Sequence, residues 1–294
     1  MEFSRFVIDN ELGSIESDYS FKSLTTIGSG GNIKCVYFPK DIDSLRKAYK
    51  YIKDNNLMHF IIGNGSNILP SDNYYEGIVI CLKRMKYTME MLDDGVLVSA
   101  FYPTVKLAYD LAECELGDLS FLGGIPGLLG GAIYNNSGAY NDHISNHILC
   151  VRYIDTAGEI QEIKNNACAF GYRKSIFHHI EGIIIETLIK VSKIDTKDIL
   201  EKRKKSRLLS QPLNHKSMGS IFRNNPLIPS WQIIDGLGMR GFKIGDAAVS
   251  MKHTNFIINL GDAKSQDILS LIELIEKRSK LELGIELFRE ITVI

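Results

Sequence analysis

The chain lacks an excess of positive charge, a long hydrophobic run and a signal-peptide pattern. Its 294 residues include 34 Lys plus Arg and 35 Asp plus Glu, which gives a net charge of −1. General nucleic-acid binders and membrane-surface binders need a net basic face, so this balance argues against both classes. No apolar stretch approaches the ~18 residues that a membrane span needs. We therefore expect a cytoplasmic protein with no membrane or nucleic-acid partner, and a monomer is the simplest expectation.

The sequence also lacks the cysteine and histidine spacings of a metal or redox site. Its five cysteines include no C-x-x-C pair and lie mostly in apolar stretches. Such cysteines are typical of buried free thiols in a reducing compartment. His178 and His179 are adjacent, would point in opposite directions on a strand, and have no third ligand at a metal spacing. We therefore expect no metal site.

Three common motifs for nucleotide binding and catalysis are missing. A G-x-G-x-x-G motif would need glycine at position 33 or 68, where Ile33 and Ile68 stand. The Gly-Lys dipeptide of a P-loop does not occur, and neither does the G-x-S-x-G motif of a hydrolase. A nucleotide site in this chain must therefore be of another kind.

Helical and strand patterns alternate along the chain, which indicates an α+β or mixed α/β fold. At ~150 residues per domain the length suggests about two domains, and three small ones are compatible with it. Apolar periodicity and capping residues predict helices over residues 41–54, from 103, from the cap Thr196 to before 212, around 231–237, and from the cap Ser265 to Gly284. Strands are predicted over 78–82, 96–100, 183–191, 253–260 and 285–294, with a hairpin over 151–163. The composition changes near residue 195, which we take as a domain boundary.

A first glycine loop reads Gly63-Asn64-Gly65-Ser66-Asn67. Glycine and asparagine tolerate a left-handed backbone, so consecutive N–H groups can converge into a concave site for a pyrophosphate. The alternative interpretation is an ordinary tight turn.

A second glycine block over residues 123–131 reads GGIPGLLGG, with five glycines in nine residues. So little side-chain bulk lets the backbone approach a flat ligand closely. A packing kink is the alternative, although so many glycines are entropically costly without a reason.

Three polar residues are candidates for chemistry, each with an ordinary structural alternative. Arg173 can pair bidentately with a carboxylate, or it is a surface arginine. Ser220 follows a glycine and can expose its hydroxyl on a strained turn, or it caps that turn. Strand alternation puts Glu290 on the face opposite Leu287 and Ile291, where it faces either a cleft or solvent.

Taken together and in order, these segments resemble the UDP-N-acetylenolpyruvoylglucosamine reductase family, whose FAD domain is shared with vanillyl-alcohol oxidase. The resemblance covers almost the whole chain. It runs through TTIGSGGNI (25–33), IIGNGSNIL (61–69), FLGGIPGLLGGAIYNNSGAY (121–140), YRKSIF (172–177), QPLNHKSMGSIF (211–222), KHTNFIIN (252–259) and ELFREI (286–291). The glycine-rich block followed by YR-x-S and GS-x-F in that order is highly specific.

Two segments depart from the family pattern. Residues 135–141 read NNSGAYN where the family usually has MNAGAYG, so the loop ends without its glycine. After GS-x-F, residues 223–226 read RNNP, one residue more before the proline than the usual Lys-Asn-Pro. These changes bear on the loop exit and the substrate contacts, not on the chemistry.

The resemblance implies an α+β protein with a two-subdomain FAD-binding fold of the vanillyl-alcohol-oxidase type and a C-terminal α/β substrate domain. We expect FAD-binding subdomain 1 over residues 1–82, subdomain 2 over 83–194 and the substrate-binding domain over 195–294. The short C-terminal region is closer to the form of the family that lacks an extra tyrosine-bearing loop.

The resemblance further implies noncovalent FAD, reduced by NADPH, which then passes hydride to UDP-N-acetylglucosamine enolpyruvate and yields UDP-N-acetylmuramate for peptidoglycan. Arg173 and Glu290 match the residues that stabilise the enol-like dianion, and Ser220 matches the proton donor. Candidate substrate-binding residues are Tyr172, Arg223 and Asn224. The expected FAD-binding residues are Gly63, Asn64, Gly65, Ser66, Asn67, Gly123, Gly124, Ile125, Gly130, Gly131 and Ala132.

Two other functions remain as alternatives. Another FAD oxidoreductase of the same superfamily, acting on a hydroxy acid or a sugar, would share the N-terminal loops but not YR-x-S, GS-x-F and the terminal glutamate together. A non-catalytic nucleotide-sugar binding protein descended from the reductase would keep the loops and could lose the catalytic trio, yet all three residues are present.

Overall fold

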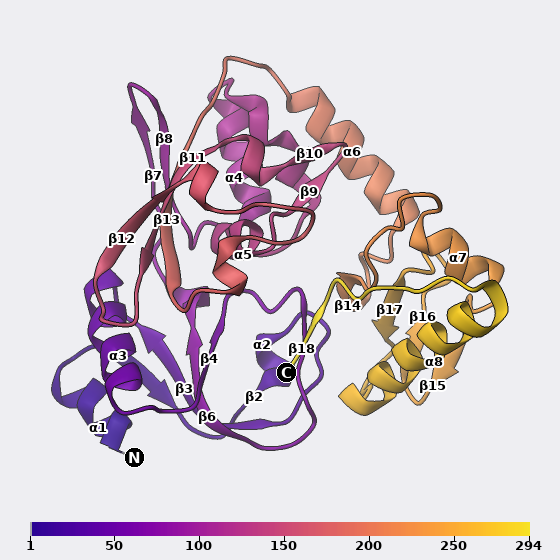
Figure 1. Ribbon diagram of the computed structural model, residues 1–294, viewed down its shortest axis with the longest axis horizontal. Helices are drawn as coiled ribbons and strands as arrows, with labels where there is room; N and C mark the ends of the chain where they lie inside the picture. The colour runs from indigo at the N-terminus through magenta and orange to yellow at the C-terminus, as the bar shows by residue number, and fades with distance from the viewer. Residues whose placement is uncertain (1) are drawn as a thin grey trace. The chain divides into compact units, whose positions relative to one another are not determined.

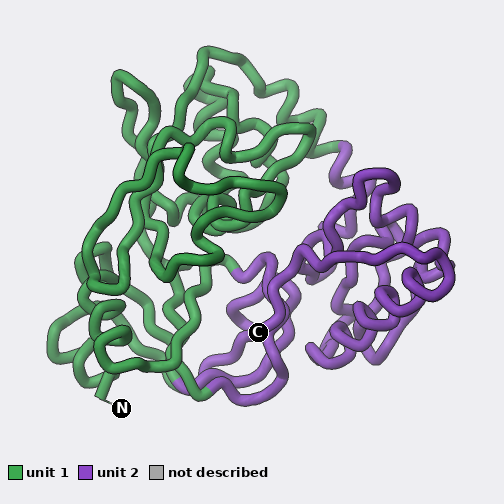
Figure 2. The backbone as a smooth tube through the Cα atoms, in the orientation of Figure 1, with its two compact units in different colours: residues 1–17, 35–64, 76–205 green, residues 18–34, 65–75, 206–294 purple. Residues whose placement is uncertain are grey.

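The computed structural model describes residues 2–294, which divide into two compact units (Figure 2). Unit 1 comprises the described residues up to Ser17 and residues 35–64 and 76–205; unit 2 comprises residues 18–34, 65–75 and 206–294. The chain passes between the units more than once, and the first glycine loop, 63–67, straddles one of these crossings. The expected division into three domains stays a prediction.

Helices and strands are both numerous, as the sequence patterns predict (Figure 1). The α-helices are α1 (Glu2–Asp9), α2 (Phe21–Leu24), α3 (Ile42–Asp54), α4 (Thr104–Glu113), α5 (Leu129–Tyr134), α6 (Lys197–Ser210), α7 (Ser230–Gly236) and α8 (Ser265–Leu283). The strands are β1 (Gly13–Glu16), β2 (Tyr19–Ser20), β3 (Asn32–Pro39), β4 (His59–Ile62), β5 (Ile68–Leu69), β6 (Tyr75–Cys81), β7 (Met89–Leu92), β8 (Gly95–Ser99), β9 (Gly138–Ala139), β10 (Asp142–His143), β11 (Ile148–Ile154), β12 (Ile160–Lys164), β13 (Ile183–Ile189), β14 (Lys216–Ser220), β15 (Lys243–Ile244), β16 (Ala247–Val249), β17 (Phe256–Asn259) and β18 (Thr292–Val293).

Unit 1 contains two sheets with separate hydrophobic cores. The first has the strand order β1-β3-β6-β4, in which β4 and β6 run parallel, and α1 and α3 pack their apolar faces into its core. Helix α3 begins after Asp41, whose carboxylate accepts from Ser44 N at 2.8 Å as a side-chain cap. The second sheet is antiparallel, ordered β12-β11-β13-β8-β7, and its core includes residues of α4 and α5.

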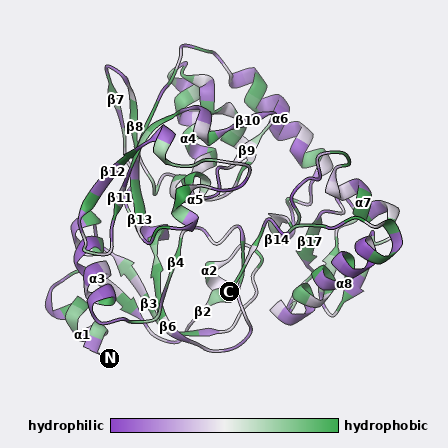
Figure 3. Cartoon of the chain, in the orientation of Figure 1, coloured by the Kyte–Doolittle hydropathy of each residue, from purple (hydrophilic) through white to green (hydrophobic). Residues whose placement is uncertain are grey.

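Unit 2 contains an antiparallel sheet ordered β14-β17-β16-β15, whose core it shares with helices α7 and α8. Helix α8 is amphipathic, as its two colours in Figure 3 show, because Ile268, Leu271, Ile272 and Ile275 are all buried. It ends at Gly284, whose φ of +67 is the left-handed C-cap that the sequence predicts. Strand β18 pairs in parallel with β5.

Several details differ from the sequence predictions. The predicted terminal strand over 285–294 is a strand only at Thr292–Val293, because the preceding residues form isolated backbone contacts instead of a continuous ladder. Thr196 was expected to cap α6, but its hydroxyl has no hydrogen-bond partner and Asp195 accepts from Lys197 N at 3.1 Å instead. The N-cap of α8 is Lys264, one residue before the expected Ser265.

The cysteines are free, and Cys35, Cys81 and Cys168 are buried, whereas Cys114 is exposed and Cys150 is half-buried. Within residues 2–294, no helix is both long enough and apolar enough to cross a membrane.

Candidate active site

Ser220 ends strand β14 at a bulge that contains Gly219. The pairing between β14 and β17 shifts register between Ser217 and Ser220. Gly219 has a φ of +79, a left-handed conformation that glycine adopts without the steric cost of a Cβ. A bulge of this kind re-aims the side chain next to it. Ser220 is half-buried.

The segment that carries Glu290 is held beside Ile221–Arg223, the residues that follow Ser220. Glu290 N donates to Ile221 O at 2.8 Å, and Arg223 N donates to Phe288 O at 2.8 Å. The chain on either side of Ile221 is therefore tied to the chain on either side of Glu290. This contact brings together two main-chain segments of unit 2 that carry the predicted proton donor and the predicted carboxyl, which the sequence separates by 70 positions (290 minus 220).

Asn67 fastens the same terminal segment from its other end. Its Nδ2 donates to Glu290 O at 3.1 Å, and Thr292 N donates to Asn67 O at 3.0 Å. Leu287 and Ile291 are each 7% exposed and anchor the segment in the core, as the alternation predicts. Val293, two residues after Ile291, is 42% exposed, and Glu290 itself is half-buried. The terminal residues are thus pinned rather than frayed.

Arg173 lies in unit 1, at the second central position of a two-residue turn. Gly171 and Lys174 exchange backbone hydrogen bonds across this turn, and Arg173 has a φ of +55. Its Nη2 donates to Gly138 O at 3.0 Å, and its guanidinium carbon lies 4.9 Å from the centre of the Tyr172 ring. The tyrosine is 51% exposed. Arg173 itself is half-buried, and a guanidinium is suited to pair with a carboxylate through two parallel N–H donors.

Arg223 and Asn224, the substrate-binding candidates of unit 2, lie where β14 leads towards α7. Arg223 Nε is buried and has no hydrogen-bond partner. Asn224 Oδ1 accepts from Ser230 N at 3.3 Å, and Asn224 is exposed. A buried donor without a partner is costly, so Arg223 suits a site where a polar ligand completes its hydrogen bonding.

The first glycine loop contains one left-handed glycine, a conformation that a pyrophosphate nest uses. Gly65 has a φ of +62, and a Cβ there would lie 2.3 Å from Leu24 O, so only glycine fits. Thr26 N donates to Gly65 O at 3.1 Å and holds the loop within unit 2. In unit 1, a Cβ on Gly63 would lie 3.2 Å from the Leu128 side chain, which brings the start of this loop next to the second glycine block. The residues present fit a bound dinucleotide.

The second glycine block serves two purposes. Gly131, in the first turn of α5, is exposed, and a Cβ there would meet nothing within 4 Å, so the backbone is open to a flat ligand. Gly123 differs, because a Cβ there would lie 2.3 Å from the Leu200 side chain of α6. Packing therefore explains Gly123, while ligand approach suits Gly131.

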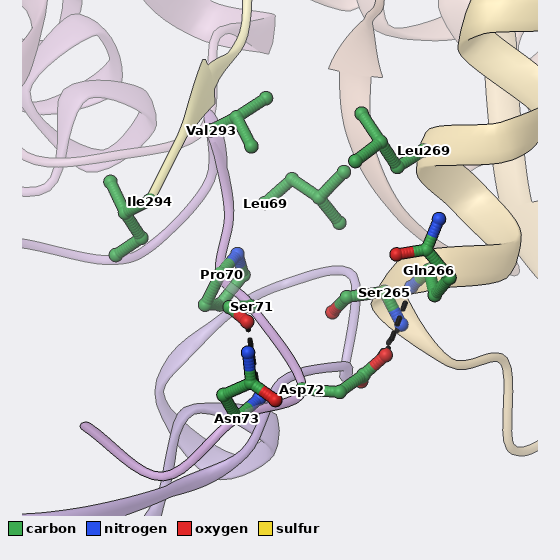
Figure 4. A pocket seen from close by; sticks show the side chains of 10 residues that line it. All are labelled: Leu69, Pro70, Ser71, Asp72, Asn73, Ser265, Gln266, Leu269, Val293 and Ile294. Atoms are coloured by element: carbon green, nitrogen blue, oxygen red, sulfur yellow. Dashed lines mark hydrogen bonds between the residues drawn. The ribbon is translucent and has the colours of Figure 1, made fainter.

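Unit 2 also contains a cavity of about 230 Å³ between β5, β18 and the start of α8 (Figure 4). Asp72 accepts from Ser265 N and Gln266 N at 2.9 Å each and so satisfies the first turn of the helix. None of the predicted site residues lines this cavity.

Two segments of unit 2 contribute to the family resemblance, but the sequence analysis assigned no function to their residues. Gly28 and Gly30 have φ values of +65 and +115, and their loop packs on the first glycine loop through Thr26. His253 Nδ1 is buried without a partner, and burial lowers the pKa of this imidazole. The three glycines within residues 28–31 could have marked the Gly28–Gly30 loop in the sequence. No spacing pattern in the sequence pointed to His253.

Comparison with known proteins agrees with this geometry. A family model described as UDP-N-acetylenolpyruvoylglucosamine reductase, C-terminal domain, matches residues 211–294, and an FAD binding domain model matches residues 33–164. A UDP-N-acetylenolpyruvoylglucosamine reductase of Halalkalibacterium halodurans is 36% identical over 89% of this chain and 88% of its own. The chain belongs to the UDP-N-acetylenolpyruvoylglucosamine reductase family.

Other reductases of this family match over nearly the full length. The Clostridium tetani protein is 32% identical over 100% of this chain and 96% of its own. The crystal structure of the enzyme from Thermus caldophilus has a TM-score of 0.79 and 28% identity, covering 95% of this chain and 98% of that one. The expected FAD-binding fold with a C-terminal reductase domain is confirmed. The roles of individual site residues stay predictions.

Proposed function

We propose that this protein is the NADPH-driven, FAD-dependent reductase that converts UDP-N-acetylglucosamine enolpyruvate to UDP-N-acetylmuramate in peptidoglycan biosynthesis. The observation that carries the proposal is the match to reductases of this name over both the FAD-binding region and the C-terminal domain. The contact between the Ser220 and Glu290 segments supports it, because the reductase chemistry needs these two residues together.

FAD, when bound, supplies the hydride chemistry between NADPH and the alkene of the substrate. The loop at 63–67 would hold its pyrophosphate through backbone N–H groups, and the block from Gly123 to Ala132 would line its flat ring system. Noncovalent binding is part of the proposal. Precipitation in acid should then release all of the yellow colour into the supernatant, and colour retained on the precipitate would contradict it.

The protein's own residues stabilise charge and deliver a proton. Arg173 pairs with the substrate carboxylate and stabilises the negative charge that develops there, and Glu290, as a protonated carboxyl, donates a hydrogen bond to the same charge. Such preorganised stabilisation is worth ~3–4 kcal/mol per donor in well-studied enzymes. The Ser220 hydroxyl donates a proton to the carbon next to the carboxylate, which is a strong base at that stage. Tyr172, Arg223 and Asn224 hold the rest of the substrate.

The proposal also places the protein in the cytoplasm as a monomer without membrane or nucleic-acid partners, acting in cell wall biogenesis and hence in cell shape and division. The net charge of −1 supports the lack of a nucleic-acid or membrane-surface partner. Size-exclusion chromatography with light scattering tests the monomer, and a dimer mass would overturn that part alone.

The deciding experiment compares NADPH consumption with and without the enolpyruvyl substrate. The reductase should consume NADPH rapidly only when the substrate is present and should form one UDP-N-acetylmuramate per NADPH. Rapid peroxide formation from a sugar or hydroxy acid would instead favour an oxidase of the same superfamily. A colourless protein that cannot be reconstituted with FAD would favour a non-catalytic binding protein.

A further inference from the structure

Arg173 occupies a backbone position that its residue type does not favour. The turn between Gly171 and Lys174 puts Arg173 at a φ of +55, a left-handed region where glycine and asparagine are the usual residues. A strained backbone conformation persists only where surrounding contacts hold it in place, and such positions cluster at functional sites. The structure must therefore contain contacts that hold this turn.

Three such contacts come from alternate residues of the segment 134–138, which leaves helix α5. Ser175 Oγ donates to Tyr134 O at 2.7 Å, and Arg173 Nη2 donates to Gly138 O at 3.0 Å. Between them, Asn136 Nδ2 donates to Gly171 O at 2.9 Å. Gly171, Arg173 and Ser175 are thus each hydrogen-bonded to the same continuous segment, residues 134–138.

The two side chains in this clamp are almost completely buried. Asn136 is 2% exposed and Ser175 is 1% exposed, so neither is available to touch a ligand in solution. Asn136 is itself at a φ of +43, and its Oδ1 accepts from Ser145 N at 3.1 Å. The amide therefore joins the turn of Arg173 to the loop at Ser145 and has both its donor and its acceptor in use.

We propose that Asn136 and Ser175 are positioning residues that hold the guanidinium of Arg173 for the substrate step. The inference rests on the proposed function, because it takes Arg173 as the group that pairs with the substrate carboxylate. It adds that helix α5 and the loop after it determine the position of Arg173. Helix α5 begins in the second glycine block, and its last carbonyl and the loop that follows it fix the turn that carries the arginine. A shift of about 1 Å in such a group can lower a rate by ~10²-fold.

The test measures the two half-reactions separately in the FAD-loaded protein. Asn136→Asp keeps the shape and the acceptor but removes the donor to Gly171, and Ser175→Ala removes the hydroxyl. Each variant should leave flavin reduction by NADPH within about twofold of the parent and slow reoxidation by the enolpyruvyl substrate by roughly 10- to 100-fold, the scale expected for a misplaced group. Slowing of both half-reactions to the same degree would overturn the proposal.

Matched controls in the same unit separate positioning from a general structural role. Asn165 Nδ2 donates to Ser145 O and Ile148 O at 2.7 and 2.8 Å, and Thr187 Oγ1 donates to Cys150 O at 2.7 Å. Neither side chain contacts the turn of Arg173. Thr187→Val removes a hydrogen bond at a site as buried as the clamp and should lower thermal stability to a similar degree, whereas Asn165 is half-buried and Asn165→Asp should cost less. Both half-reactions should stay near the parent rates in each control. Selective loss of the substrate step in these controls would also overturn the proposal.

A double-mutant cycle with Arg173→Ala gives the decisive readout. If Asn136 acts through Arg173, Asn136→Asp should slow the substrate step of the parent but have little further effect once Arg173 is alanine. Equal fold-losses in both backgrounds would assign Asn136 an independent role and refute the proposal. Failure of the proposed function is recognised separately, because the unmodified protein itself would then not reduce the enolpyruvyl substrate.

Discussion

Replacing Gly219 with alanine tests whether the bulge before Ser220 has a catalytic purpose. Gly219 has a φ of +79, and a Cβ added there would meet nothing within 4 Å. The substitution therefore creates no clash, and its effect is confined to the backbone. The left-handed conformation costs alanine about 1–2 kcal/mol in the folded state. Alanine also restricts the unfolded chain more than glycine does, which stabilises the folded state by about 0.4–1 kcal/mol.

The net loss in free energy of unfolding is thus about 0–1.5 kcal/mol. A domain with the usual ~5–15 kcal/mol of stability stays more than about 99% folded after such a change. Unfolding cannot then account for a large loss of activity. Relaxation of residue 219 towards a negative φ would instead redirect Ser220, the adjacent residue.

Gly238 provides a matched control, because it has a φ of +67 and an added Cβ there also meets nothing within 4 Å. It follows helix α7, away from the β14 bulge. Chemical denaturation should show a similar small destabilisation for Gly219→Ala and Gly238→Ala. Stopped-flow measurement of the half-reactions should show normal reduction by NADPH in both variants. Only Gly219→Ala should slow reoxidation by the enolpyruvyl substrate, by roughly 10²-fold.

Two results would refute this reasoning. If Gly219→Ala reoxidises at the rate of Gly238→Ala, the bulge does not aim Ser220. If Gly219→Ala lowers the free energy of unfolding by several kcal/mol, Gly219 has a structural role even though an added Cβ would meet no neighbouring atom.

Three further predictions address individual side chains. Ser220→Ala should leave the NADPH step near normal and slow the substrate step by roughly 10²–10⁴-fold, as expected for a lost proton donor; equal slowing of both steps in stopped-flow traces would assign Ser220 a structural role. Glu290→Gln is nearly isosteric, so FAD content and NADPH reactivity should persist, but the amide cannot transfer a proton, so the substrate step should fall by roughly 10²-fold; an unchanged substrate step would remove Glu290 from the mechanism. Burial lowers the pKa of His253 below its ordinary value of about 6.5. The unfolded state therefore binds more protons at His253 as the pH falls through that value, so the contribution of His253 to the free energy of unfolding should be constant above it and decrease below it. His253→Gln should flatten that decrease in urea titrations at several pH values, and a parallel pH profile in the variant would show that another group is responsible.

Local patterns in the sequence were sufficient for most helices and strands. Helix α3 was predicted from its apolar face and forms with Asp41 as its cap. Helix α8 was predicted to end at Gly284 and does so in the left-handed conformation that glycine allows. These elements depend on neighbours three or four residues apart, which the sequence contains in full.

Caps and terminal strands were less predictable, because several residues compete for the same backbone donors. Asp195 accepts from Lys197 N in place of the expected Thr196, whose hydroxyl is buried without a partner. The terminal segment is a two-residue strand rather than a ten-residue one, since its neighbours in space are β5 and the residues after β14 and not a long partner strand.

The sequence by itself determined the family, the presence of FAD chemistry and the identity of the candidate residues, because these are carried by ordered motifs. Only the tertiary structure decided which of those residues meet. The main chain of Glu290 is held beside Ile221, the residue after Ser220, because Asn67 from the first glycine loop donates to its carbonyl and Ile221 O accepts from its amide. Asn136 and Ser175 hold the turn of Arg173 through backbone carbonyls, and a carbonyl has no sequence signature. Contacts between distant residues through the main chain are the part of the site that no one-dimensional pattern records.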